Sequence, residues 1–268
     1  MANYFGDDFI RIIGVEWCPD CSTSGRTAAY HEPYVGTPIE GEPVPNYGMI
    51  DAWAVIGAER EVLDPPAHWR WPKPSPFVHG WKVGNMLFLG GQRALDRDGR
   101  LLGLGDIEIQ TDEAFRNLDT MLKAGGGDRH NLMRQNTYFR FFGEGRAVTD
   151  YWEKMTAVRR RYMSVPSAAG AGLRIESLSL ADELIQVEGI GVLGDEKQRL
   201  QPAGHWDWSI PGNQFTQGWK IGRLAFIGGQ ISADARARAV GHEDGPAREI
   251  LQKPRTAELG SFLSAVLH

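Results

Sequence analysis

A carboxylate inside an apolar strand is the first feature of this chain that could do chemistry. Glu188 interrupts the run Ile185–Val192, and Asp51 interrupts a similar run at Ile50–Ile56. Loss of water favours the neutral form of such a carboxyl group, so it can take and return a proton. Arg174 lies 14 residues before Glu188 (188 minus 174). Because a guanidinium binds a carboxylate through two parallel hydrogen bonds, Arg174 and Glu188 suit proton transfer on a small carboxylate-bearing molecule.

Two thiols form the second candidate group, in the run Trp17-Cys18-Pro19-Asp20-Cys21. We expect a pair of thiols in a loop, because Ser22-Thr23-Ser24-Gly25 follows in place of the helix that activates the first thiol of redox motifs. Three functional alternatives stay open: a redox pair, a zinc site that includes His31, and Cys18 as a nucleophile in a new pocket.

A long internal repeat organises the chain. The stretch Phe77–Gln92 recurs as Phe215–Gln230, at a constant offset of 138 residues (215 minus 77, and 230 minus 92). Each copy has the pattern of two short strands joined by a Lys-x-Gly turn, and the second strand ends in Gly-Gly-Gln. Paired glycines let a backbone or a ligand approach closely. A repeat of this length predicts that the fold is built twice.

The phase of the repeat predicts the domain boundaries. One copy is complete at residues 71–194, whereas the other is split between residues 1–57 and 205–268, with linkers at 58–70 and 195–204. We interpret the chain as a circularly permuted tandem whose split domain closes within one chain or between chains. The split copy lacks most of its second helix. The motifs His68–Trp71 and His205–Trp208 lie between the copies, where packing at a domain or subunit junction is the simplest interpretation.

The complete copy gives the order of elements. Apolar periodicity and turn residues predict strands at 78–82 and 86–90, a helix at 110–124, a strand at 132–142, a second helix capped by Thr149, and strands at 174–180 and 184–193. The order β-β-α-β-α-β-β indicates an α+β fold, in which a mixed sheet carries its helices on one face. A symmetric oligomer would cover the other face.

Composition narrows the class of partner. The net charge is −5 and no long basic run occurs, which argues against nucleic acid. No apolar run approaches the ~20 residues of a membrane helix, and Met1–Asp8 lacks the features of a signal peptide. We therefore expect a cytoplasmic protein with a small-molecule partner and no membrane contact.

The run Lys82–Gln92, the Gln110-Thr111 pair that opens the first helix, and the last strand Ile185–Val192 together resemble the Rid (YjgF, reactive-intermediate deaminase) family. The resemblance covers residues 75 to 192 and, weakly, the split copy. It implies two chorismate-mutase-like units per chain, a pseudo-trimeric or hexameric type of assembly, and pockets between neighbouring units. It also implies hydrolysis of an imine or enamine with release of ammonia, with no metal and no cofactor.

The resemblance assigns residues to roles. Glu188 and Arg174 fall on the family's acid and carboxylate clamp, and the split copy keeps an acid at Asp51 but has no arginine at the clamp position. Cys18 is kept as a further catalytic candidate. The family's usual tyrosine is replaced by Phe77. The expected substrate-binding residues are Arg174, Glu176, Phe77, His79, Gly91, Gln92, Phe215 and Gln217.

Two other classes of function stay open. The lost tyrosine at Phe77 and the added carboxylate of Glu176 suit a non-catalytic regulatory module that binds a small molecule. The split second copy suits a partner subunit of a hetero-oligomeric hydrolase. We expect either a homo-oligomer, trimeric or hexameric, or a complex with another Rid-like chain.

Overall fold

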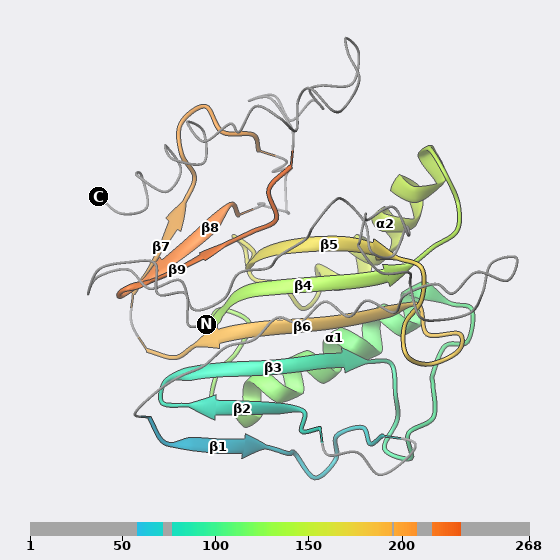
Figure 1. Cartoon of the computed structure of the whole chain (residues 1–268), viewed down its shortest axis with the longest axis horizontal. Coiled ribbons are helices and arrows are strands. Elements are labelled where there is room, and N and C mark those ends of the chain that lie inside the picture. Colours follow the sequence, from blue (N-terminus) through green and yellow to red (C-terminus); the bar gives the residue numbers. More distant parts are fainter. Residues whose placement is uncertain (1–57, 72–76, 195, 208–215, 232–268) are drawn as a thin grey trace, which may run out of the picture. The chain divides into compact units, whose positions relative to one another are not determined.

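The computed structural model describes residues 58–71, 77–194, 196–207 and 216–231. Its main element is a six-stranded sheet with the strand order β1-β2-β3-β6-β4-β5. The strands are β1 (Arg60–Leu63), β2 (Gly80–Val83), β3 (Met86–Arg93), β4 (Leu132–Arg140), β5 (Ala169–Ile175) and β6 (Ile185–Val192). Strand β6 pairs antiparallel with both β3 and β4, whereas β4 and β5 run in the same direction, so the sheet is mixed (Figure 1).

Both helices lie on one face of this sheet (Figure 1). Helix α1 (Ile107–Ala124) begins three residues before the expected Gln110, because the Asp106 carboxylate caps it by accepting hydrogen bonds from the backbone of Glu108 and Ile109 at 2.9 and 3.1 Å. Helix α2 (Arg146–Arg159) begins after Gly145 rather than at Thr149. No helix of the described segments is long and apolar enough to cross a bilayer.

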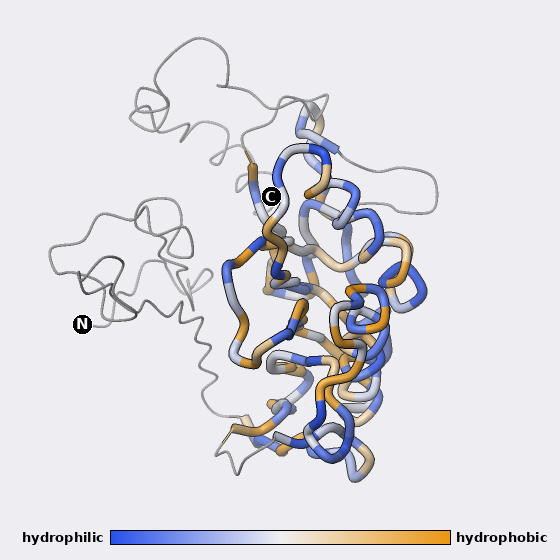
Figure 2. Tube along the Cα trace, turned by 90° about the vertical axis from the view of Figure 1, so that its right-hand side faces the viewer, coloured by the Kyte–Doolittle hydropathy of each residue, from blue (hydrophilic) through white to orange (hydrophobic). Residues whose placement is uncertain are grey.

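The core lies between the sheet and the helices. The predicted apolar stripe of α1 is confirmed as buried, and α2 contributes Met155 and Val158. Hydrophobic and hydrophilic residues follow one another along the strands and helices in Figure 2, as elements with one buried face require. The buried apolar cluster that joins α1 to the sheet includes Leu87, Leu89, Phe115, Leu118, Met121, Leu122, Phe139, Ile185 and Val187.

The two segments expected as linkers contain strands. Strand β1 pairs with β2 at the edge of the main sheet, and β7 (Lys197–Leu200) pairs with β8 (Gly218–Ile221). Together with β9 (Leu224–Ile227), these form a three-stranded sheet of order β7-β8-β9. In β1 only Leu63 is buried, so the segment has no clear apolar alternation and its pairing with β2 decides its conformation.

The two copies of the repeated stretch have the same local fold. Strand β2 pairs with β3 as β8 pairs with β9, and the Gly-Gly residues follow in the same register. Gly229 donates a backbone hydrogen bond of 3.0 Å to the carbonyl of Gly170 at the start of β5. A side chain at position 229 would lie 2.9 Å from the Ala171 Cβ, so the glycine permits this close contact. The rest of the expected split domain lies outside the described residues.

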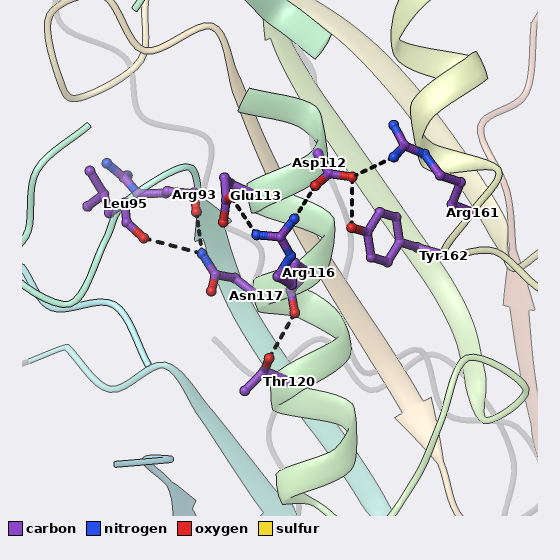
Figure 3. A network of polar contacts seen from close by, with 9 residues as sticks. All are labelled: Arg93, Leu95, Asp112, Glu113, Arg116, Asn117, Thr120, Arg161 and Tyr162. Atoms are coloured by element: carbon purple, nitrogen blue, oxygen red, sulfur yellow. Dashed lines mark hydrogen bonds and ion pairs between the residues drawn. The ribbon is translucent and has the colours of Figure 1, made fainter. Parts of the chain in front are cut away.

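A polar network on the outer side of α1 fastens the turn that follows α2 (Figure 3). The carboxylate of Asp112 accepts a hydrogen bond of 2.8 Å from the Tyr162 hydroxyl, and it forms ion pairs with Arg161, at 3.2 Å, and with Arg116. The network therefore holds the residues that follow α2 against α1.

We expect Tyr162→Phe to lower the free energy of unfolding by about 1 kcal/mol, because the change removes one hydrogen bond to a half-buried carboxylate. Urea titration of the two proteins measures the difference. An unchanged unfolding midpoint would show that the bond contributes nothing net.

Candidate functional site

Glu188 lies at the centre of the main sheet and is positioned by two side chains of the neighbouring strand. Its Oε1 atom accepts a hydrogen bond of 2.9 Å from the Asn136 amide and one of 2.8 Å from the Tyr138 hydroxyl. Val187 is fully buried in the core under α1, so alternation along β6 places Glu188 on the sheet face that carries no helix. The carboxylate predicted from the sequence is therefore half-buried and fixed.

A β-bulge in β3 lies directly beside Glu188. Leu89 pairs with Gly189 and Gln92 pairs with Val187, so the two residues Gly90 and Gly91 oppose the single residue Glu188. A Cβ at position 91 would lie 2.2 Å from the Gln186 side chain, so any other residue here would have to displace that side chain. Strand β3 thus presents backbone rather than side chains next to the carboxylate, as bulges beside active sites commonly do.

A buried ion pair supports the same region. The guanidinium of Arg93 donates to Glu183 at 3.2 Å, to Ser179 at 2.5 Å and to Gln186 at 2.8 Å. Burial lowers the pKa of Arg93 and raises the pKa of Glu183, while each charge opposes the shift of the other. Arg93 also stacks on the Trp71 ring at 4.6 Å. This cluster ties the loop before β6 to the end of β3 and so fixes Gln186 over Gly91.

A second buried cluster holds the other end of the bulge. The Oε1 atom of Gln92 accepts hydrogen bonds from His68 Nε2 at 2.7 Å and from Trp69 Nε1 at 3.0 Å, and its amide donates to the Gly90 carbonyl at 2.8 Å. The second copy repeats this contact between His205 and Gln230, at 2.9 Å. The His-Trp motif, expected at a domain or subunit junction, contacts Gln92 in the first copy and Gln230 in the second. Gln92, expected to bind substrate, thus fixes the backbone at Gly90 in this structure, and its contact with substrate stays a prediction.

His68 makes the stability of the fold sensitive to acid. Burial lowers its pKa from 6.5 to about 4, partly offset by the hydrogen bond to Gln92, and its Nδ1 atom is buried without a partner among the described residues. At His68 the unfolded chain takes up a proton near pH 6.5, whereas the folded protein does so only near pH 4. The contribution of His68 to the free energy of unfolding is therefore fully present above pH 6.5 and is lost as the pH falls toward 4. The difference corresponds to about 3 kcal/mol.

We therefore expect the unfolding midpoint of the wild type to fall more steeply between pH 6.5 and pH 4 than that of His68→Gln. His205→Gln is the matched control, because His205 occupies the same place in the second copy but is more exposed. Calorimetry over this pH range gives both slopes. Equal slopes for wild type and His68→Gln would contradict the assignment.

Arg174 and Glu188 have different partners in the structure. Arg174 is exposed on β5 and donates a hydrogen bond of 2.9 Å to the Gly143 carbonyl. A Cβ at Gly172 would meet the Trp152 ring of α2, so alternation places Arg174 on the helix side of the sheet and Glu188 on the other side. The described contacts do not bring the two groups together, and their joint role stays a prediction.

The other predicted residues fall into three groups. His79 is mostly buried, its ring lies 4.6 Å from His68, and burial lowers its pKa. Gln217 is fully buried and donates to the Trp206 carbonyl at 2.6 Å, which is packing within the second copy. Phe77 and Glu176 are exposed. The residues Asp51, Cys18, Cys21 and Phe215 lie outside the described part of the chain.

Asn136 and Tyr138 were missed by the sequence analysis. Both occur in the aromatic strand predicted at 132–142, where period-two alternation would have placed them on one face. Only the pairing of β4 with β6 shows that this face meets Glu188, because the two strands are about fifty positions apart (188 minus 138).

Comparison with known proteins identifies the complete copy. A family model described as Endoribonuclease L-PSP matches residues 71–174. These residues form a Rid family domain. The Rid domain is 28% identical over 120 residues to a RutC family protein of Pyrococcus horikoshii, an alignment that covers 44% of this chain and 89% of that protein. The resemblance inferred from the sequence is thus confirmed for this domain, whereas the permuted tandem stays a prediction.

Two further relatives extend the comparison of the Rid domain. A 2-iminobutanoate/2-iminopropanoate deaminase of Dermatophagoides farinae is 23% identical over 123 residues, which cover 46% of this chain and 90% of that protein. A putative endoribonuclease from Thermotoga maritima, known from a crystal structure, is 24% identical to this chain in sequence. The superposition has a TM-score of 0.44 and covers 50% of this chain and 98% of the Thermotoga maritima chain.

Proposed function

We propose that this protein is a Rid-type hydrolase that converts the imine or enamine of a small carboxylate-bearing metabolite into the carbonyl compound and ammonia. The observation that carries the proposal is Glu188, whose carboxylate is held by Asn136 and Tyr138 beside the Gly90–Gly91 bulge in a Rid family domain. The Dermatophagoides farinae relative is named for an activity of the same kind, the deamination of 2-iminobutanoate and 2-iminopropanoate.

The proposed chemistry needs one group that moves protons and one that holds the substrate. Water attacks the carbon of the C=N bond while Glu188 takes its proton, and the carboxyl then protonates the nitrogen that leaves as ammonia. Arg174 is the proposed carboxylate clamp, and since it lies on the opposite side of the sheet from Glu188, we propose that a neighbouring copy of the chain supplies it. Its present acceptor is a backbone carbonyl, which a substrate carboxylate can replace with a stronger, charge-assisted bond.

Ammonia release tests the proposal. 2-Aminoacrylate is generated from serine by a dehydratase, and the decay of the imine is followed with and without this protein. We expect faster release of ammonia in its presence, and loss of that gain in Arg174→Ala and Glu188→Ala. Unchanged activity in both variants would reject the assignment of these residues.

The placement of Arg174 and Glu188 on opposite sides of the sheet favours a second candidate, a non-catalytic small-molecule-binding module. Thermal shifts with 2-oxo acids, together with no gain in ammonia release, would support it.

We further propose that the chain works in the cytoplasm as a homo-oligomer, trimeric or hexameric, or as a partner of another Rid-like chain. Native mass spectrometry distinguishes these assemblies.

A further inference from the structure

The two hydrogen bonds that reach Glu188 end on the same oxygen. Tyr138 and Asn136 both donate to Oε1, at 2.8 and 2.9 Å, and they lie two residues apart on the same face of β4. Among the described residues, Oε2 has no hydrogen-bond partner. Two donors on one oxygen prevent the carboxyl group from rotating, so its two oxygens are no longer equivalent.

Burial of the Asn136 side chain should destabilise the fold, because one of its polar atoms has no partner in β4 or elsewhere among the described residues. Its side chain is 6% exposed, and its amide oxygen is buried with no partner among the described residues. An unpaired buried acceptor destabilises a fold by about 1–3 kcal/mol. Within the described segments, the hydrogen bond to Glu188 is the one contact that uses the polarity of this side chain, so we assign it the role of orienting that carboxylate.

We propose that Tyr138 and Asn136 are positioning residues that hold Oε1 of Glu188, so that Oε2 is the oxygen that transfers protons. The inference rests on the proposed imine hydrolysis. Oε2 takes a proton from water as the new C–O bond forms, and the π pair of the C=N bond moves to nitrogen. Oε2 then delivers that proton to nitrogen, which gives a carbinolamine. Oε2 next takes the carbinolamine hydroxyl proton and passes it to the same nitrogen, so that the C=O bond forms as the C–N bond breaks and ammonia leaves. Tyr138 keeps its own proton throughout.

Tyr138→Phe tests the proposal, because it removes only the hydroxyl. We expect kcat to fall about tenfold, which corresponds to about 1.4 kcal/mol, while KM is unchanged. Tyr162→Phe is the matched control: Tyr162 also donates a 2.8 Å hydrogen bond to a carboxylate, that of Asp112, away from the site (Figure 3). We expect this control to keep both kinetic constants.

A double variant separates positioning from a general loss of stability. If Tyr138 acts through Glu188, adding Tyr138→Phe to Glu188→Gln causes no further loss of kcat. An additive loss, a change in KM alone, or an equal loss in Tyr162→Phe would each overturn the proposal.

A measurement without substrate distinguishes this inference from the proposed function. In protein labelled with ¹³C at glutamate carboxyls, the Glu188 signal is identified by its disappearance in Glu188→Gln. We expect it to shift in Tyr138→Phe and in Asn136→Ala, and to stay in place in Tyr162→Phe. An unmoved signal rejects the anchoring of Oε1. If the wild type releases no ammonia, the proposed hydrolysis fails and with it the proton-transfer role of Oε2, whereas a shifted signal still supports the anchoring.

Discussion

Glu188→Gln is expected to slow ammonia release by about 100-fold or more, the usual size of a general acid–base contribution. The amide has nearly the same shape and can still accept the hydrogen bonds of Asn136 and Tyr138 through its oxygen. It cannot carry a proton between water and the substrate nitrogen. The loss should therefore appear in kcat, with a smaller change in KM.

Steady-state rates on enzymatically generated 2-aminoacrylate measure this effect. Glu113→Gln is the matched control, because Glu113 is a partly exposed carboxylate of α1 paired with the exposed Arg116. We expect its rate to equal that of the wild type, since exposed ion pairs contribute little. Glu188→Gln with the wild-type rate would remove Glu188 from the mechanism.

Glu183→Ala is expected to lower the free energy of unfolding by about 3–5 kcal/mol, because it leaves the Arg93 guanidinium buried without its anion. The two side chains are 0% and 7% exposed, so water does not replace the lost partner. Burial already opposes ionisation of both groups, since it raises the pKa of Glu183 and lowers the pKa of Arg93. The intact pair is therefore worth far less than breaking it costs.

Denaturant titration of Glu183→Ala, Arg93→Met and Glu183→Leu/Arg93→Met tests this interpretation. The double variant removes both charges, so we expect it to recover part of the stability that the single variants lose. The stacking of Arg93 on Trp71 limits how much is recovered. A loss below about 0.5 kcal/mol in Glu183→Ala would place the pair among ordinary surface contacts.

The sequence determined those features whose cause is local. The apolar stripe of α1 repeats at helical spacing, and the helix follows from it and from the cap at Asp106. The strands that flank the Lys-x-Gly turns follow from the repeat, and both copies have the same pairing. Glu188 stood out because a carboxylate inside an apolar strand is costly without a purpose.

Tertiary structure alone decided what those elements meet. The insertion of β6 between β3 and β4 brings Tyr138 and the Gly90–Gly91 bulge to Glu188, from positions far apart in the chain. Strand β1 has no pattern of its own, and its pairing with β2 gives it a conformation. The side of the sheet on which Arg174 lies depends on strand register, and a shift of one residue moves a side chain to the other face.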